Sequence, residues 1–328
     1  MQFIDVCNGD ADGLIARHQF RLSYPVPAGQ LTLITGPKRE VALLARVDIG
    51  AARVGAEINV FDVSYDQNAA SVRRLLSAGS TIRYFDHHRA NQLQTHPRLD
   101  AHIDTSAQTC TSLIVDRFLN AAHRPWAIAA AFGDNLAEVA EALAAEANLT
   151  SADALLLRQL GECINYNAYG DSIDDLYYAP AEIAERMAPY TDPLHFARCE
   201  DVLPRLREGF AADLLLAEAV VPAHASQVAA AYILPDAPWA RRISGTFANV
   251  LTRNHPHRAH AVLSCAPNGE YMVSIRAPAD RPTGADAIAV AFTGGGGRAA
   301  AAGINNLPRD ETARLIELLE AAYRAASL

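Results

Sequence analysis

Short apolar runs alternate with longer segments of helical spacing in the first part of the chain. The runs are rich in β-branched and aromatic residues, which predicts strands; they are residues 3–6, 31–35, 58–63 and 82–85. Apolar residues at helical spacing follow the first run (Leu14, Ile15) and the third run (Val72, Leu75). Because strands that alternate with helices usually pair in parallel, this pattern predicts an α/β fold with a parallel sheet.

The pattern changes further along the chain. Residues 126–133 are apolar and predict a buried helix that ends at Gly133, and residues 136–220 are rich in Ala and Leu at helical spacing. Two later runs, residues 259–264 and 271–276, predict strands joined by a turn at Asn268 and Gly269. Residues 311–326 predict a final helix.

Prolines mark a change of composition before these last strands. Pro222, Pro235 and Pro238 interrupt the helical pattern. We therefore expect a first domain of residues 1–220, a linker of residues 221–235 and a smaller C-terminal α/β domain of residues 236–328. A chain of 328 residues, half of them hydrophobic, is long enough to bury a core in each of two domains.

The charge narrows the choice of partners. The net charge of −9 argues against a broad nucleic-acid-binding surface, which would be basic. It does not exclude a small anionic substrate at a metal site, because bound cations can be the largest local charges.

The cysteines and the N-terminal residues indicate the cellular compartment. The five cysteines are scattered without a C-x-x-C pair, which favours a reducing compartment over a disulfide framework. The N-terminus lacks the basic and apolar regions of a signal peptide, and no apolar run reaches the ~18 residues of a transmembrane helix. We expect a cytoplasmic protein with no membrane association, and the oligomeric state stays open, with a homodimer as one option.

Acidic and imidazole side chains follow the ends of several predicted strands. Asp10 and Asp12 follow the first, Asp62 ends the third, and Asp86, His87 and His88 end the fourth. The carboxyl ends of parallel strands meet at one edge of a sheet, where ligands bind. Carboxylates that converge there can hold one cation or a pair. The alternative is a set of polar turns with helix-capping carboxylates.

Other polar positions are open to two interpretations. Asp134 follows Gly133 and is either a turn residue or a further acid of the cluster. Asp104 lies before Thr109 and Thr111, and we expect it to cap a helix there. A run of four glycines ends at Arg298, and its exposed backbone N–H groups favour an anion site over a flexible linker.

Together these motifs resemble, in order and spacing, those of the DHH phosphoesterases over nearly the whole chain. The N-terminal motifs are residues 8–13, 61–62, 86–88 and 133–134. Residues 274–276 and 295–298 resemble the substrate-binding motifs of the DHH-associated C-terminal domain. The resemblance implies a two-domain hydrolase of phosphoester or phosphoanhydride bonds, with its active site in the cleft between the domains.

The resemblance also implies roles for individual residues. Two Mn²⁺ ions would be bound, or Mg²⁺ or another divalent cation, with Asp62 bridging them. The implied metal ligands are Asp10, Asp12, Asp62, His87 and Asp134. Asp86 would support the histidines, and His88 would face the scissile phosphate. The implied substrate-binding residues are Asn8, Arg276, Gly295, Gly296, Gly297 and Arg298.

The chain departs from the family pattern at two places. Many members carry a histidine a few residues before the first aspartate, where this chain has Cys7 and Asn8. The ligand set of one ion is therefore open. Arg298 stands where the family usually has a histidine; it keeps a permanent charge for phosphate but cannot act as a base.

These observations favour a Mn²⁺-dependent phosphodiesterase that releases mononucleotides from short RNA or DNA. Dephosphorylation of 3′-phosphoadenosine 5′-phosphate could accompany this activity. The alternative enzyme is a phosphodiesterase of cyclic or linear dinucleotides, and an inorganic pyrophosphatase fits less well because of the glycine run. A further alternative is a nucleotide-binding protein that has lost catalysis through the changes at Cys7, Asn8 and Arg298.

Overall fold

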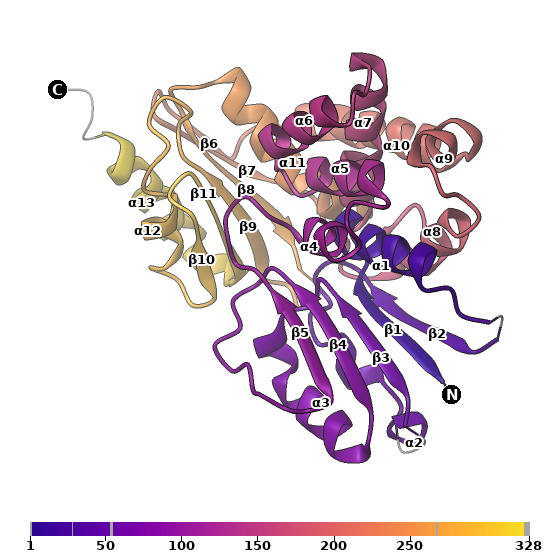
Figure 1. Ribbon diagram of the computed structural model, residues 1–328. Coiled ribbons are helices and arrows are strands. Elements are labelled where there is room, and N and C mark those ends of the chain that lie inside the picture. The colour runs from indigo at the N-terminus through magenta and orange to yellow at the C-terminus, as the bar shows by residue number, and fades with distance from the viewer. Residues whose placement is uncertain (1, 28, 53–54, 267, 325–328) are drawn as a thin grey trace. The chain divides into compact units, whose positions relative to one another are not determined.

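The computed structural model describes residues 2–27, 29–52, 55–266 and 268–324 (Figure 1). The chain divides into two compact units, Met1–Arg207 and Glu208–Leu328. The boundary falls inside a helix, α10 (Val202–Glu218). In the described part of the chain, none of the helices is both long enough and apolar enough to cross a membrane.

The first unit contains a parallel sheet of five strands in the order β2-β1-β3-β4-β5. The strands are β1 (Phe3–Asn8), β2 (Leu31–Gly36), β3 (Glu57–Phe61), β4 (Thr81–Asp86) and β5 (Leu99–Ile103). Cys7 pairs with Phe61, which in turn pairs with Phe85, so β1, β3 and β4 end side by side. This confirms the predicted parallel sheet and the shared edge of its strand ends.

The inner strands β1, β3 and β4 of this sheet are buried on both faces. Cys7, Phe61 and Phe85 pack into a core formed with helices on one face. Their neighbours in the strands, such as Val60 and Tyr84, pack into a second core on the other face. In Figure 1, α1 (Ala11–Ser23) and α4 (Thr111–Phe118) lie on one side of this sheet and α3 (Tyr65–Ala78) lies on the other. Burial on both faces explains why the strands read as nearly continuous apolar runs.

Helices make up the rest of the first unit, as the Ala- and Leu-rich spacing predicted. They are α5 (Arg124–Gly133), α6 (Ala137–Glu146), α7 (Ser151–Asn167), α8 (Pro180–Met187) and α9 (Pro193–Cys199). The short elements are η1 (Leu43–Arg46), α2 (Ile49–Ala52) and η2 (Ile173–Asp175). Helix α7 approaches α5 closely because Gly161 lacks a side chain: a Cβ there would lie 1.9 Å from the Ala129 carbonyl oxygen. This contact fixes the end of α5, which is followed by Asp134.

The second unit contains a mixed sheet in the order β10-β11-β9-β8-β7-β6. Its strands are β6 (His224–Ala225), β7 (Ala229–Ile233), β8 (Ala259–Cys265), β9 (Tyr271–Arg276), β10 (Gly295–Gly297) and β11 (Ala301–Leu307). Its helices are α11 (Pro238–Asn254), α12 (Ala285–Ala289), η3 (Arg309–Glu311) and α13 (Thr312–Arg324). The predicted hairpin is present: β8 and β9 are antiparallel, and Gly269 in their turn has a φ of 81°.

Several segments differ from the sequence-based expectations. Strand β5 was not predicted, because it is an edge strand with exposed, polar positions. Residues 221–235, expected to form a linker, include β6 and β7 of the second sheet. The limits of the two domains stay a prediction. The last residues of the expected final helix, 325 and 326, lie outside the described residues.

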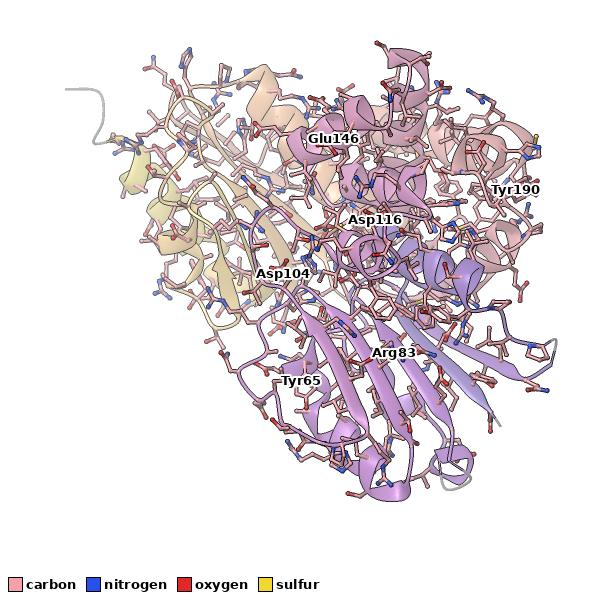
Figure 2. The ribbon with its side chains drawn as sticks, in the orientation of Figure 1. Tyr65, Arg83, Asp104, Asp116, Glu146 and Tyr190 are labelled. Carbon is pink, nitrogen blue, oxygen red and sulfur yellow. The ribbon has the colours of Figure 1, made fainter. Side chains whose placement is uncertain are left out.

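The expected capping role of Asp104 is wrong. Asp104 lies between β5 and α4, and α4 begins only at Thr111 (Figure 2). Its carboxylate instead accepts hydrogen bonds from the Ser106 N–H at 3.0 Å and from Arg117 Nη2 at 2.7 Å. The Ser- and Thr-rich segment resembles a helix start in sequence, but its polar side chains form a local turn.

Candidate metal centre

The candidate site lies at the carboxyl edge of the parallel sheet, where the strand order changes direction at β1. The turn after β1 approaches the end of β2 closely, since a Cβ on Gly9 would lie 2.1 Å from the Gly36 carbonyl oxygen. Asp10 then caps α1, with its Oδ1 accepting from the Gly13 N–H at 3.0 Å. In doubly wound sheets, ligands bind at such a switch in strand order.

Asp12 is held by the start of α4. Its Oδ2 accepts from the Thr111 N–H and its Oδ1 from the Ser112 N–H, both at 2.7 Å. The Ser112 hydroxyl also donates to the Asp12 carbonyl oxygen at 2.8 Å. The positive end of the helix dipole stabilises the carboxylate. Each oxygen keeps a lone pair, so Asp12 is oriented and can still bind a cation.

Asp62 follows β3 in a left-handed backbone conformation, with a φ of 57°. A residue other than glycine seldom adopts this conformation, and such strain gathers at functional sites. Its Oδ1 lies 3.2 Å from the Thr111 hydroxyl and 3.3 Å from His87 Nε2. Burial, together with the charges of Asp10 and Asp12, raises the pKa of Asp62 well above its ordinary value. A nearby cation would reverse this effect.

His87 and His88 have different surroundings at the end of β4. Burial by itself lowers the pKa of His87, but its contact with Asp62 and the charge of Asp12 raise it to about 10. His88 Nδ1 lies 2.6 Å from Asp86 Oδ1, and the side chain is 43% exposed. Asp86 is fully buried and also accepts from the Tyr65 N–H at 3.3 Å, at the start of α3 (Figure 2). Asp86 therefore orients the ring of His88.

Asp134 joins the cluster from the end of α5. Burial and the charge of Asp12 raise the pKa of Asp134 to about 6. The ligand atoms of Asp12, His87 and Asp134 lie within 4.8 Å of one another, as do those of Asp62, His87 and His88. Three of the predicted carboxylate ligands thus lie around His87, the predicted imidazole ligand.

Asp10 is placed differently from the other predicted ligands. Among the described residues, it belongs to neither of the two potential metal-binding groups. Its Oδ2 forms an ion pair with Lys38 Nζ at 2.6 Å. Burial by itself raises the pKa of Asp10, but the Lys38 ammonium and the Gly13 N–H outweigh burial and lower it.

Lys38 is the residue of this site that the sequence analysis missed. It follows β2, its N–H donates to the Ala168 carbonyl oxygen at 3.0 Å, and its Nζ donates to Asn165 Oδ1 at 3.1 Å. Burial by itself lowers the pKa of Lys38, but the charges of Asp10 and Tyr169 raise it well above its ordinary value. A signal was present, because Lys38 also follows the carboxyl end of a parallel strand.

Cys7 and Asn8 stand where the proteins that the motifs resemble usually have a histidine, and their surroundings differ. Cys7 is buried, and burial raises the pKa of its thiol to about 12. The thiol therefore stays protonated and is a poor metal ligand. Asn8 Oδ1 is buried without a hydrogen-bond partner in the described part of the chain. Asn8 lines a cavity of about 100 Å³ together with Lys38, Asp62 and His88.

The donor set fits a hard divalent cation. Carboxylates with one imidazole suit Mn²⁺ or Mg²⁺ better than a soft metal. The pKa values of Asp62 and Asp134 are raised for the same two reasons, burial first and then repulsion from the neighbouring carboxylates. A bound cation removes that repulsion. His87 with Asp12 and Asp134, and His87 with Asp62 and His88, thus form two overlapping groups that are able to hold a metal ion.

The predicted substrate-binding residues of the second unit lie together at one end of its sheet. Arg276 ends β9 and pairs with Ala301 of β11, and Gly297 pairs with the next residue, Ala302. Arg276 Nε donates to Asn249 Oδ1 at 2.7 Å. Gly295, Gly296 and Gly297 form β10, an ordered edge strand, and Arg298 follows it with an exposed side chain. Their role in binding substrate stays a prediction.

Comparison by sequence gives no relative: no protein-family model matches the chain, and neither does any curated protein. Comparison by structure finds similar proteins. The DHH domain of a member of a family of ribosomal proteins matches with a TM-score of 0.69 and 15% identity, covering 100% of this chain and 87% of that one. At this identity the likeness shows the fold.

Two further solved structures share this fold. RecJ from Thermus thermophilus in complex with Mn²⁺ matches with a TM-score of 0.62 and 14% identity, over 99% of this chain and 52% of RecJ. The pGpG-specific phosphodiesterase PggH from Vibrio cholerae matches with a TM-score of 0.51 and 12% identity, over 99% of each chain. The predicted resemblance to the DHH proteins is therefore confirmed in the fold of both units.

Proposed function

Because the chain has the fold of the DHH-domain proteins, we propose that it is a divalent-metal-dependent phosphoesterase. The convergence of Asp12, Asp62, His87 and Asp134 at the carboxyl edge of the sheet carries this proposal. These residues would hold Mn²⁺ or Mg²⁺, with the number of ions considered separately below. The metal would supply an activated hydroxide and polarise the phosphoryl group.

The side chains around this cluster suit a phosphoryl group. Asn8, Lys38 and His88 line the cavity of about 100 Å³ beside Asp62. Lys38 Nζ and the Asn8 amide can bind phosphoryl oxygens. His88 is held through Nδ1 by Asp86, which leaves Nε2 to carry a proton for a phosphoryl or leaving oxygen.

We further propose short oligonucleotides as the substrates. The net charge of −9 disfavours a long nucleic-acid track, and the fold is shared with an exonuclease and with a phosphodiesterase of the linear dinucleotide pGpG. Arg276, the β10 glycines and Arg298 would bind the rest of the substrate. The match with PggH over 99% of each chain favours linear dinucleotides as the second candidate substrate.

The test is product analysis with a ladder of 5′-labelled RNA, from dinucleotide upward, with Mn²⁺ and with chelator. We expect Mn²⁺-dependent release of mononucleotides, fastest on oligomers of two to five residues. An Asp62→Asn variant should be inactive, and Glu138→Gln, which changes an exposed carboxylate on α6, should retain activity. The same assay should include pGpG, a cyclic dinucleotide and 3′-phosphoadenosine 5′-phosphate.

The outcomes separate the candidates. Turnover confined to pGpG or a cyclic dinucleotide would replace the oligonucleotide proposal with the dinucleotide one. No turnover of any of these substrates, with metal bound, would support a nucleotide-binding protein that has lost catalysis.

A further inference from the structure

We propose that Lys38 takes the place of a second cation beside Asp10, so that each chain binds one divalent ion. The inference rests on the proposed metal site and concerns its stoichiometry. The family resemblance implies two ions and counts Asp10 among their ligands. The contacts of Asp10 favour a different arrangement.

Both oxygens of the Asp10 carboxylate are engaged by groups of the chain. Oδ1 accepts from the Gly13 N–H at 3.0 Å, because Asp10 caps α1. Oδ2 lies 2.6 Å from Lys38 Nζ. A charge-assisted contact of this length satisfies a buried carboxylate without a metal. Asp12 differs, because it accepts from the Thr111 and Ser112 N–H groups, which orient the carboxylate without neutralising it.

The Lys38 ammonium is held in place from several sides. Its Nζ donates to Asn165 Oδ1 at 3.1 Å and lies 5.2 Å from the centre of the Tyr169 ring. Its backbone N–H donates to the Ala168 carbonyl oxygen. These contacts come from the end of α7 and the residues after it. The position of the Lys38 amine is therefore fixed by several groups and not by Asp10 alone.

The chain also offers only weaker ligands in place of the histidine that a second ion usually has. Cys7 and Asn8 occupy the positions where the family usually has a histidine. Cys7 is fully buried on the core face of β1, packed among apolar side chains. Asn8 offers a single neutral amide oxygen. With Asp10 neutralised by Lys38, the carboxylates left for a metal are Asp12, Asp62 and Asp134. They fall in two potential groups that share the His87 imidazole, and one shared imidazole suits one divalent ion.

Lys38 would therefore place a fixed positive charge at the position where the family resemblance implies a second metal ion. Lys38 lines the same cavity as Asp62 and His88. Its amine can bind a phosphoryl oxygen but cannot activate a water as a metal does. The single ion held by Asp12, Asp62, His87 and Asp134 would then supply the hydroxide alone.

The experiment is to count the ions. Metal-free protein is titrated with Mn²⁺ by calorimetry, the bound metal is quantified by elemental analysis, and the saturated protein is examined by electron paramagnetic resonance. We expect one Mn²⁺ per chain with the hyperfine pattern of an isolated ion. Two ions per chain with an exchange-coupled signal would overturn the inference and leave the proposed function intact. No bound Mn²⁺ would overturn both.

Two variants make the test specific to Lys38. The neutral pair Asp10→Asn/Lys38→Met should still bind one ion with an affinity close to that of the wild type. If Asp10 were a ligand, the affinity would fall by more than the ~10–100-fold typical of indirect metal contacts. Lys38→Ala should free the Asp10 carboxylate, so that the variant binds a second Mn²⁺ with lower affinity. If the variant still binds one Mn²⁺ per chain, Lys38 does not occupy the position of a second cation. Circular dichroism checks that both variants fold.

Discussion

The two sheets of the molecule bring polar residues together through different strand topologies. In the first unit, β1, β3 and β4 are parallel neighbours, so the residues after Asn8, Phe61 and Asp86 emerge at one edge. In the second unit, β9 is antiparallel to both of its neighbours, so Arg276 lies where β11 begins at Ala301. Parallel topology brings together those candidate metal ligands that follow strands, and Asp134 joins them from the end of α5. The second unit depends instead on the register of a glycine strand.

This difference predicts effects of different size on catalysis. Substitutions at the parallel edge should change the chemical step, because they alter groups that are proposed to contact the metal or the phosphoryl group. Substitutions at the edge of the mixed sheet should change substrate affinity. A variant of the second unit that abolished kcat with normal folding would contradict the comparison.

The largest effect is expected for Asp12→Asn. The amide replaces one carboxylate oxygen with an NH2 donor, which would face one of the two backbone N–H donors, Thr111 or Ser112, and it brings no negative charge to the metal. Because metal catalysis supplies several kcal/mol and each ~1.4 kcal/mol is tenfold in rate, kcat/KM on a short RNA should fall by about 1,000-fold or more.

A control for this variant is Asp66→Asn, which changes a carboxylate of α3 that also accepts two backbone N–H groups, those of Asn91 and Gln92. Its kcat/KM should stay close to that of the wild type. Equal losses in both variants would mean that the effect of Asp12 is structural and not catalytic.

His88→Gln should have the next largest effect. The glutamine side chain can still bind Asp86 but cannot transfer a proton, so kcat should fall by about 100-fold, the lower range for a general acid. KM should change little, and Mn²⁺ binding should be kept. A leaving group of low pKa, such as nitrophenolate, should restore much of kcat; the absence of any rescue would argue against proton transfer by His88.

A pH effect is expected from the helical core of the first unit. Burial lowers the pKa of His18 to about 4, and its Nε2 lies 2.9 Å from the Tyr190 carbonyl oxygen. The unfolded chain binds the proton with a pKa of about 6.5, so the neutral ring stabilises the fold above pH ~6.5 and this contribution is lost as the pH falls toward 4. Between pH 7.5 and 5 the free energy of unfolding should fall by about 2 kcal/mol through this residue.

Denaturant unfolding of the wild type and His18→Gln at both pH values measures this contribution. The variant should be less stable at pH 7.5 but should lose about 2 kcal/mol less on acidification. Equal losses in the two proteins would exclude His18 as the source of acid sensitivity in this unit.

Much of the first unit could be predicted from the sequence, and the reasons are specific. Its inner strands are buried on both faces, so they appear as unbroken apolar runs, and Asp12, Asp62 and His87 could be placed together because parallel strands end alike. Strand β5 could not be predicted, because it is a half-exposed edge strand. Lys38 was missed because its ion pair with Asp10 depends on tertiary packing between residues far apart in the chain.

The smallest effect is expected in the second unit, for Arg276→Gln. Arg276 is positioned by Asn249 and by its own strand, so the glutamine should keep the fold while removing the charge. Hydrogen bonds to charged groups contribute about 1.5–3 kcal/mol; at the lower value, about 1.5 kcal/mol, KM for a short RNA should rise by about tenfold, with kcat within about threefold of the wild type. The matched control is Arg281→Gln, whose side chain contacts Tyr323 and the Ala322 carbonyl oxygen of α13. If both arginine variants change KM equally, or if neither changes it, Arg276 does not contact the substrate. The proposed difference between a catalytic first sheet and a substrate-binding second sheet would then be wrong for Arg276.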